Sequence, residues 1–267
     1  MLGYSFPFPG TVMFKRRVGE LAKRPHIVPA DATVSQAAGL MISADVSCLA
    51  AVTGAKVVGF ITERELVRHL DVDLDPSTPV RELIARNGGG IPKNLGVDEA
   101  LKQMLERHTR HLPVVDIGGS LLGLVTDTEL VDALAVDFMV ENVDCRALMR
   151  VAPIRLSPDR TVQTALDHMR AQNAGSVLVV AEGKAVGIFT ERDALRIIVG
   201  RPEHLADPLS VHMTKPVICV PVDAMVYKVI LYMRQKGVRR LAVCEADGNL
   251  AGLLSQQDIL LYARRMG

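Results

Sequence analysis

Four hydroxyl residues in the chain each stand three positions before a carboxylate, a spacing that can bind a polar ligand. The pairs are Thr62 and Glu65, Thr126 and Glu129, Thr190 and Asp193, and Ser255 and Asp258. An ionised carboxylate has two acceptor oxygens, so one acid can accept hydrogen bonds from two neighbouring hydroxyl groups. A helix that begins at the hydroxyl residue also presents unpaired N–H groups, which favour a phosphate or a carboxylate. The spacing therefore indicates four candidate ligand-binding positions.

The same spacing has an interpretation that needs no ligand. Thr-x-x-Glu at the start of a helix is a capping box, in which each side chain bonds to the backbone of the other residue. Glu65 and Glu129 fit this description well. Both interpretations stay open from the residues alone.

Basic residues precede two short apolar runs, where they could bind an anion. Arg110 and His111 stand before one run, and Arg239 and Arg240 stand before another. The guanidinium group suits phosphate because it is a planar, permanently charged fork of donors. The alternative is that these residues form a solvated basic surface.

Two further arginines stand between a hydroxyl residue and its acid. They are Arg64 and Arg192. Each either reaches a phosphate or pairs with neighbouring acids on its own helix, and the second interpretation is slightly favoured.

The elements that carry these residues recur along the chain. The four hydroxyl residues are 64, 64 and 65 positions apart, each within the pattern Gly, two apolar residues, Thr or Ser, two variable residues, acid. Upstream of each, apolar residues spaced i, i+3, i+4, i+7 predict helices over 34–41, 97–104, 162–169 and 226–233. Apolar runs at 49–52, 112–115, 177–180 and 241–244, each followed by a glycine-containing turn, predict strand hairpins. The sequence thus predicts an α/β (α+β) fold built from four β-α-β-β-α units.

These motifs resemble the CBS domain. The G-h-h-T-x-x-D signature, the V-x-x-A-L-x-x-M helix and the L-P-V-V strand carry the resemblance over about residues 18–265. Four copies resemble two tandem pairs, called Bateman modules, a layout similar to that of the gamma subunit of AMP-activated protein kinase. The predicted boundaries are an N-terminal arm at 1–17 and repeats at 18–75, 76–140, 141–203 and 204–267.

The resemblance implies a ligand cleft between the repeats of each pair. Adenosine-containing ligands, such as AMP, ADP, ATP or S-adenosylmethionine, bind there in the family. The signature acid holds the ribose hydroxyls and the signature hydroxyl contacts phosphate or sugar. Asp193 and Asp258 match the family's acid, whereas Glu65 and Glu129 depart from it, which puts ribose binding by these two in doubt. The arginine-bearing positions before the apolar runs often face phosphates in the family.

Composition argues against several other classes of protein. The formal net charge is +1, which gives no global reason to expect nucleic acid or an anionic membrane as partner. No apolar run approaches 18 residues, and the N-terminus does not read as a secretory signal. The four cysteines are far apart, which predicts reduced thiols in the cytoplasm. No catalytic motif was found, so we expect no enzymatic activity.

We therefore predict a cytoplasmic, non-enzymatic regulatory protein that binds adenosyl ligands and acts on an unidentified partner protein. It would need no metal and no obligatory cofactor. The alternative is an interaction scaffold whose clefts bind no ligand. In either case the two pairs would form a compact disc, within one chain or through homodimerisation.

Overall fold

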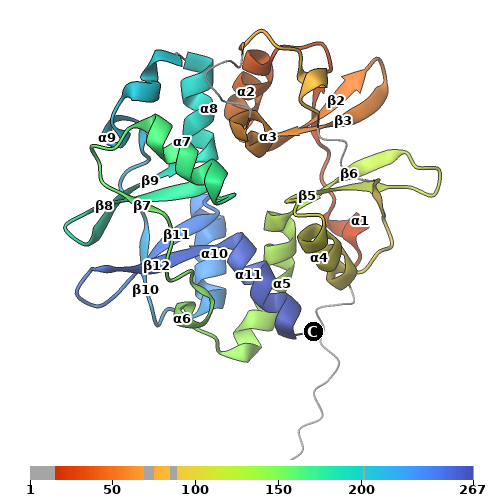
Figure 1. The fold of residues 1–267 in the computed structure, drawn as a ribbon. Helices are drawn as coiled ribbons and strands as arrows, with labels where there is room; N and C mark the ends of the chain where they lie inside the picture. The colour runs from red at the N-terminus through yellow and green to blue at the C-terminus, as the bar shows by residue number, and fades with distance from the viewer. Residues whose placement is uncertain (1–15, 69–74, 85–88, 201, 267) are drawn as a thin grey trace, which may run out of the picture.

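The computed structural model describes residues 16–68, 75–84, 89–200 and 202–266, and it confirms the predicted mixed α/β fold. Of the predicted N-terminal arm, only Arg16 and Arg17 lie within the described residues. The described residues form four three-stranded sheets, and each sheet belongs to one β-α-β-β-α repeat (Figure 1).

The four repeats share one order of elements. Repeat 1 comprises β1 (His26–Pro29), α2 (Val34–Ser43), β2 (Cys48–Thr53), β3 (Lys56–Thr62) and α3 (Glu63–Arg68). Repeat 2 comprises β4 (Ile91–Pro92), α4 (Val97–Glu106), β5 (His111–Val115), β6 (Leu121–Thr126) and α5 (Asp127–Glu141). Repeat 3 comprises β7 (Arg155–Leu156), α7 (Val162–Ala171), β8 (Ser176–Ala181), β9 (Lys184–Thr190) and α8 (Glu191–Gly200). Repeat 4 comprises β10 (Cys219–Pro221), α10 (Val226–Lys236), β11 (Arg240–Cys244), β12 (Leu250–Ser255) and α11 (Gln256–Met266).

Short helices connect the repeats. They are α1 (Val18–Leu21) before repeat 1, η2 (Val80–Glu82) before repeat 2, α6 (Cys145–Leu148) before repeat 3, and η3 (Pro202–Ala206) and α9 (Leu209–His212) before repeat 4.

The predicted helical faces are the buried faces of the first long helix in each repeat. In α2 the buried residues are Val34, Ala37, Ala38 and Met41, and the equivalent positions are buried in α4, α7 and α10. The Thr33 side chain begins α2 by accepting a hydrogen bond from the backbone N–H three residues later. In every sheet the central strand is parallel to the first strand and antiparallel to the last.

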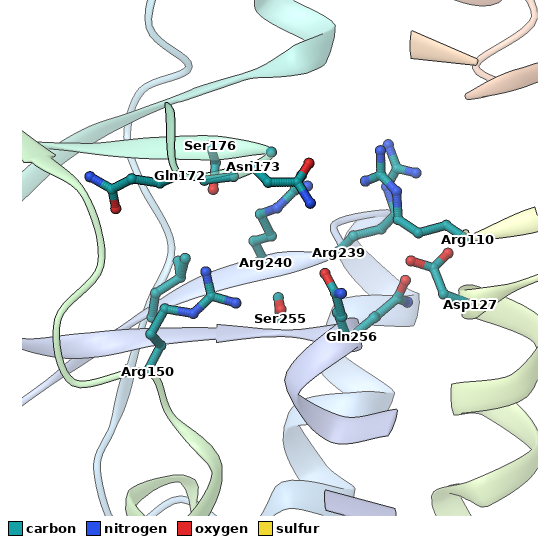
Figure 2. Close-up of a pocket in the computed structure, with 14 residues that line it drawn as sticks. Arg110, Asp127, Arg150, Gln172, Asn173, Ser176, Arg239, Arg240, Ser255 and Gln256 are labelled. Carbon is teal, nitrogen blue, oxygen red and sulfur yellow. The ribbon is translucent and has the colours of Figure 1, made fainter. Parts of the chain in front are cut away.

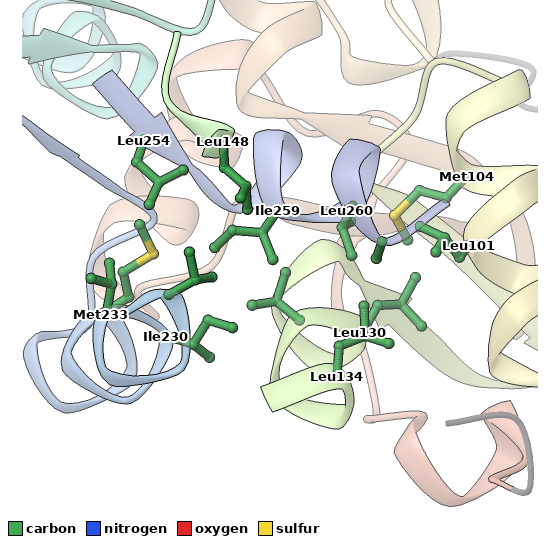
Figure 3. Close-up of a cluster of buried hydrophobic side chains, with 14 of the residues drawn as sticks. Leu101, Met104, Leu130, Leu134, Leu148, Ile230, Met233, Leu254, Ile259 and Leu260 are labelled. Atoms are coloured by element: carbon green, nitrogen blue, oxygen red, sulfur yellow. The ribbon is translucent and has the colours of Figure 1, made fainter. Parts of the chain in front are cut away.

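Two kinds of packing close the four repeats into one disc. Within each pair the sheets pack against each other: Ala50 of repeat 1 clusters with Leu124 of repeat 2, and Leu178 of repeat 3 clusters with Ala242 of repeat 4. Between the pairs the helices pack, repeat 1 against repeat 3 and repeat 2 against repeat 4. Figure 3 shows the second of these helical cores, in which α4, α5, α10 and α11 meet. A single chain therefore completes the arrangement.

In repeats 1, 3 and 4, the segment just before the first strand packs on the sheet of the other repeat in the pair, and we call it the crossing segment. Lys23 precedes β1 of repeat 1 but forms an antiparallel bridge with Leu124 in β6 of repeat 2. Arg150 precedes β7 of repeat 3 but bridges Leu253 in β12 of repeat 4. The backbones approach so closely that a Cβ atom on Gly252 would lie 2.7 Å from the Arg150 carbonyl oxygen. Only glycine fits there without displacing the crossing segment.

The cysteines differ from the expectation of four reduced thiols. Cys219 in β10 and Cys244 in β11 are joined in a disulfide between neighbouring parallel strands, with their Cα atoms 6.1 Å apart. Cys48 and Cys145 are free and buried. Among the described residues, no helix has the length and apolar character that crossing a membrane would require.

Candidate functional site

The hydroxyl–acid pairs lie where the last strand of each repeat meets its last helix. In all four repeats the acid accepts a hydrogen bond from its own hydroxyl residue, at 2.7 Å for Thr190 and Asp193 and 2.5 Å for Ser255 and Asp258. The backbone N–H of the hydroxyl residue also donates to the acid, at 2.9 Å, in repeats 2, 3 and 4. The bond from the backbone N–H is one half of a capping box, and together these bonds engage one oxygen of each acid.

In three repeats the crossing segment supplies a partner for the acid's second oxygen. Lys23 Nζ lies 2.8 Å from Glu129 Oε1, and Arg150 Nη2 lies 3.1 Å from Asp258 Oδ1. The hydroxyl of Thr214 donates to Asp193 Oδ1 at 2.9 Å. Sequence reasoning missed these partners because they lie outside the repeated motifs. Their one sequence signal is their place shortly before a repeat begins.

Two buried glutamates at the centre of the disc hold arginines from the other repeats. Glu191, the first residue of α8, accepts from Arg110 Nη2 at 2.6 Å and from Arg64 Nε at 3.2 Å. Arg240 Nη2 lies 3.6 Å from the same carboxylate. The arginine of repeat 1 thus pairs with an acid of repeat 3, not with an acid on its own helix.

Glu63, the first residue of α3, occupies the equivalent place in repeat 1 and is fully buried. It accepts from Arg192 of repeat 3 and, at 3.0 Å, from Arg239 Nη2 of repeat 4. Arg192 also pairs with Asp45. Sequence reasoning did not single out the two glutamates, although each immediately follows a signature threonine.

The charges of this network fix the ionisation of its members. Burial alone would raise the pKa of Glu191, but the surrounding arginines, Arg110 first among them, hold it well below its ordinary value. Burial lowers the pKa of Arg240 to about 10 in spite of the attraction of Glu191. At neutral pH the centre therefore contains an ionised Glu191 and a charged Arg240.

His111 lies within the same network and is neutral at physiological pH. Its Nε2 atom is 3.0 Å from the Ser47 hydroxyl, which also accepts from Arg239 Nη1 at 3.0 Å. Burial, and then the positive charges of Arg110 and Arg239, lower the pKa of His111 well below its ordinary value. A neutral imidazole next to several arginines serves as a polar spacer and not as an additional cation.

A pocket opens beside this network where repeats 2, 3 and 4 meet, and it encloses about 170 Å³. Figure 2 shows Gln172, Asn173 and Ser176 of repeat 3 on one side and Arg150, Ser255 and Gln256 on the other. The full lining is Arg110, Asp127, Arg150, Gln172, Asn173, Ala174, Gly175, Ser176, Arg239, Arg240, Leu253, Ser255, Gln256 and Gln257. The lining thus contains four arginines and a single carboxylate, that of Asp127.

The pocket brings together some of the residues singled out in the sequence and leaves out others. Arg110, Arg239, Arg240 and Ser255 line it. Asp258 does not line it but contacts two lining residues, through the bonds from Ser255 and Arg150 described above. The other candidates lie elsewhere in the structure: Thr62, Glu65, His111, Thr126, Glu129, Thr190, Arg192 and Asp193.

The family is decided by the match of four segments, which together make up most of the chain, to a known domain. A family model of the CBS domain matches residues 18–72, 90–136, 145–200 and 209–265, one match for each repeat. The chain belongs to the CBS domain family. Its four CBS domains form two pairs, and proteins of this family are typically regulatory.

Two relatives with similar sequences are proteins of Methanopyrus kandleri and Methanocaldococcus jannaschii. A protein of Methanopyrus kandleri is 35% identical over 106 residues, which are 39% of this chain and 54% of that protein. Protein MJ1225 of Methanocaldococcus jannaschii is 23% identical over 195 residues, 69% of each chain. The CBS chain spans about half of the length of the first relatives it matches, 54% in M. kandleri and 42% in a second M. jannaschii protein.

Solved structures share the four-domain fold. The crystal structure of MJ1225, a proposed archaeal homologue of γ-AMPK, superposes with a TM-score of 0.82 at 22% identity, covering 93% of this chain and 100% of that one. A conserved protein from Pyrococcus horikoshii superposes with a TM-score of 0.64 at 24% identity, covering 92% and 99%. At these identities the likeness establishes the fold alone.

Proposed function

We propose that this CBS protein is a regulatory protein that binds a phosphate-bearing adenosine ligand in the pocket between repeats 2, 3 and 4. The observation that carries the proposal is the set of four arginines, Arg110, Arg150, Arg239 and Arg240, in the pocket lining. Guanidinium groups bind phosphate oxygens through short, charge-assisted hydrogen bonds. The adenosine part of the proposal rests on the family resemblance of the signature motifs.

The charge of the pocket favours nucleotides over sulfonium ligands. AMP, ADP and ATP bring two to four negative charges, whereas the sulfonium group of S-adenosylmethionine brings a positive charge. Arg110 and Arg240 already share the Glu191 carboxylate, so a phosphate would compete with that carboxylate for the same donors. We expect affinity to rise from adenosine to AMP and from AMP to ATP.

The acid proposed to hold the ribose is Asp258, because its neighbours line the pocket. Asp258 accepts from Ser255 at 2.5 Å and from Arg150 at 3.1 Å. Ribose hydroxyls would replace the Arg150 contact and free that guanidinium for phosphate. Asp193 is engaged by Thr190, Thr214 and Arg196, and it lies outside the pocket lining.

The size of the pocket suggests how binding is transmitted. A volume of about 170 Å³ is smaller than the roughly 300–1,000 Å³ of pockets that enclose a whole ligand. We infer that a nucleotide widens the space between repeats 3 and 4. Because repeat 2 also contributes to the lining, widening shifts one pair relative to the other. A partner protein can respond to that shift only to the extent that the ligand prefers the widened state.

The test is binding of ATP, ADP, AMP, adenosine and S-adenosylmethionine, measured by calorimetry and by thermal shift, in wild type and two matched variants. Arg150→Ala removes the pocket arginine that is most exposed, with 43% of its side chain accessible. Lys23→Ala removes the equivalent ion pair in the first CBS pair, at a residue that does not line the pocket. Exposed ion pairs contribute at most about 1 kcal/mol, so both variants should fold.

We expect Arg150→Ala to weaken ATP binding by about tenfold or more, which is the loss of one charge-assisted hydrogen bond of about 1.5–3 kcal/mol. Lys23→Ala should bind ATP as the wild type does. Equal affinities in both variants would move the site away from this pocket. If none of the five ligands binds the wild type, the protein is better described as an interaction scaffold.

A further inference from the structure

Two histidines and an aspartate meet on the connection between repeats 3 and 4, away from the nucleotide pocket. His204 lies in η3, His212 is the last residue of α9, and Asp207 lies between the two helices. His204 Nδ1 is 2.6 Å from Asp207 Oδ2, and His212 Nε2 is 2.8 Å from the same oxygen. One nitrogen of each imidazole and one carboxylate oxygen therefore converge, with all three atoms within 4.8 Å of one another.

Backbone hydrogen bonds hold this cluster against repeat 3. The Asp207 carbonyl accepts from Val162 N–H at 3.0 Å, which fixes it to the start of α7. Leu209 N–H donates to the Arg160 carbonyl at 2.8 Å, which holds α9 against the same turn. The aspartate and the helix that carries His212 are thus both anchored to repeat 3.

We propose that His204, Asp207 and His212 form a binding site for a divalent transition-metal ion of the zinc class. Two imidazole nitrogens and one carboxylate oxygen are a ligand set typical of Zn²⁺, Co²⁺ and Ni²⁺, whereas Mg²⁺ and Ca²⁺ prefer oxygen ligands. Three protein ligands leave at least one coordination position for water or a second molecule.

The exposure of the three residues suits this role. The side chains are 38% exposed for His204, 35% for Asp207 and 18% for His212. An ion can therefore enter from solvent without unfolding the segment.

A bound ion would stiffen a segment that contacts repeat 3 at its signature acid. His212 stands two residues before Thr214, whose hydroxyl donates to Asp193 at 2.9 Å. Thr214 also exchanges backbone hydrogen bonds with Ile188 in β9. Metal occupancy would thus hold the crossing segment in place on the sheet of repeat 3.

The test is metal uptake by the full chain after treatment with EDTA. Co²⁺ is titrated and followed by its visible absorption, and Zn²⁺, Mg²⁺ and Ca²⁺ are compared by thermal shift. We expect one equivalent of Co²⁺ per chain, displaced by Zn²⁺, and a rise in Tm with Zn²⁺ but not with Mg²⁺ or Ca²⁺. His212→Ala and Asp207→Asn should lose binding. His26→Ala, at an exposed histidine on β1, should bind as the wild type does.

Anomalous scattering at the zinc edge from crystals of the wild type provides a second measurement that does not depend on the folding of a variant. A peak at the three residues supports the site. If the EDTA-treated wild type takes up no Co²⁺ or Zn²⁺, or if His212→Ala binds as well as the wild type, the proposal is wrong. The three residues are then a hydrogen-bonded cluster with no metal.

Discussion

Replacing Glu191 by glutamine tests whether the central network depends on this buried carboxylate. The substitution keeps the shape of the side chain and removes its charge. Arg110 Nη2 at 2.6 Å, Arg64 Nε at 3.2 Å and Arg240 Nη2 at 3.6 Å all lose their common counter-ion. These arginines come from repeats 1, 2 and 4, so the change affects the contacts of repeat 3 with every other repeat.

The expected loss of stability follows from the burial of the group. Removing one partner of a buried ion pair costs about 3–5 kcal/mol, because the remaining charge stays buried without compensation. Three guanidinium groups share this carboxylate, so we expect about 4 kcal/mol for Glu191→Gln. At roughly 2–4 °C per kcal/mol for a chain of this size, Tm should fall by about 10 °C.

The assay is thermal and urea denaturation at pH 7, with Glu182→Gln as a matched control. Glu182 belongs to the same repeat but is exposed, so its variant should stay within about 0.5 kcal/mol of the wild type. The arginines hold the pKa of Glu191 below its ordinary value of 4.5 against the effect of burial. Its contribution is therefore fully present above pH 4.5 and is lost as the pH falls through the lower folded-state pKa. The difference in the free energy of unfolding between the wild type and Glu191→Gln should decrease only below pH 4.5.

A loss of less than about 1 kcal/mol at pH 7 would refute this reasoning, because it would mean that the arginines do not need the Glu191 carboxylate. The variant also separates stability from binding. If phosphate competes with Glu191 for Arg110 and Arg240, Glu191→Gln should bind ATP more tightly than the wild type, and ATP should raise its Tm by a larger amount.

Four further substitutions probe other features of the molecule. The pKa of His111 is depressed in the folded state, so on acidification the unfolded chain binds a proton at this residue first. The free energy of unfolding should therefore fall by up to about 1.4 kcal/mol per pH unit as the pH drops below 6.5. His111→Gln should remove this slope, as measured by urea denaturation at a series of pH values. Phe189→Ala empties a fully buried position in the core between repeats 1 and 3 and should cost about 3–5 kcal/mol. Gly252→Ala should cost about 1–3 kcal/mol and weaken ATP binding, because its Cβ atom would displace the segment that carries Arg150. Gly39→Ala, where a Cβ atom meets nothing within 4 Å, should instead stabilise α2 by about 0.5–1 kcal/mol.

Each of these predictions can be contradicted by a specific result. An unchanged acid slope in His111→Gln would show that other groups titrate in that range. A small loss in Phe189→Ala would mean that the helical core between the pairs contributes little. Similar effects of alanine at Gly252 and Gly39 would show that the close approach of the crossing segment does not matter.

The sequence predicted the parts of this fold that depend on local periodicity. The buried face of α2, from Val34 to Met41, follows from the 3.6-residue repeat of a helix. The hairpins follow from glycines such as Gly248, whose φ of 83° is unfavourable for other residues. The hydroxyl–acid pairs were located correctly at helix starts, because a capping box involves residues only three positions apart.

The site was less predictable because its residues are brought together from distant segments. Arg110, Arg239, Arg240 and Ser255 were candidates and do line the pocket, yet Glu191, which pairs with Arg110 and Arg240, was missed. A glutamate after a threonine looks like any solvated residue in the first turn of a helix. Its burial becomes evident only when four repeats surround it.

The crossing segments mark the boundary between what the sequence and the tertiary structure each determine. The residues alone, through spacings of two to eight positions, specify each β-α-β-β-α unit and its repetition. Only the tertiary structure decides that Arg150 reaches repeat 4, that repeat 1 packs on repeat 3, and that arginines from three repeats share Glu191. The physical reason is that these contacts join residues about 50 to 130 positions apart, as for Arg240 and Arg64 with Glu191. Over such separations helix and strand periodicity carry no information, and the order of packing between repeats selects the partners.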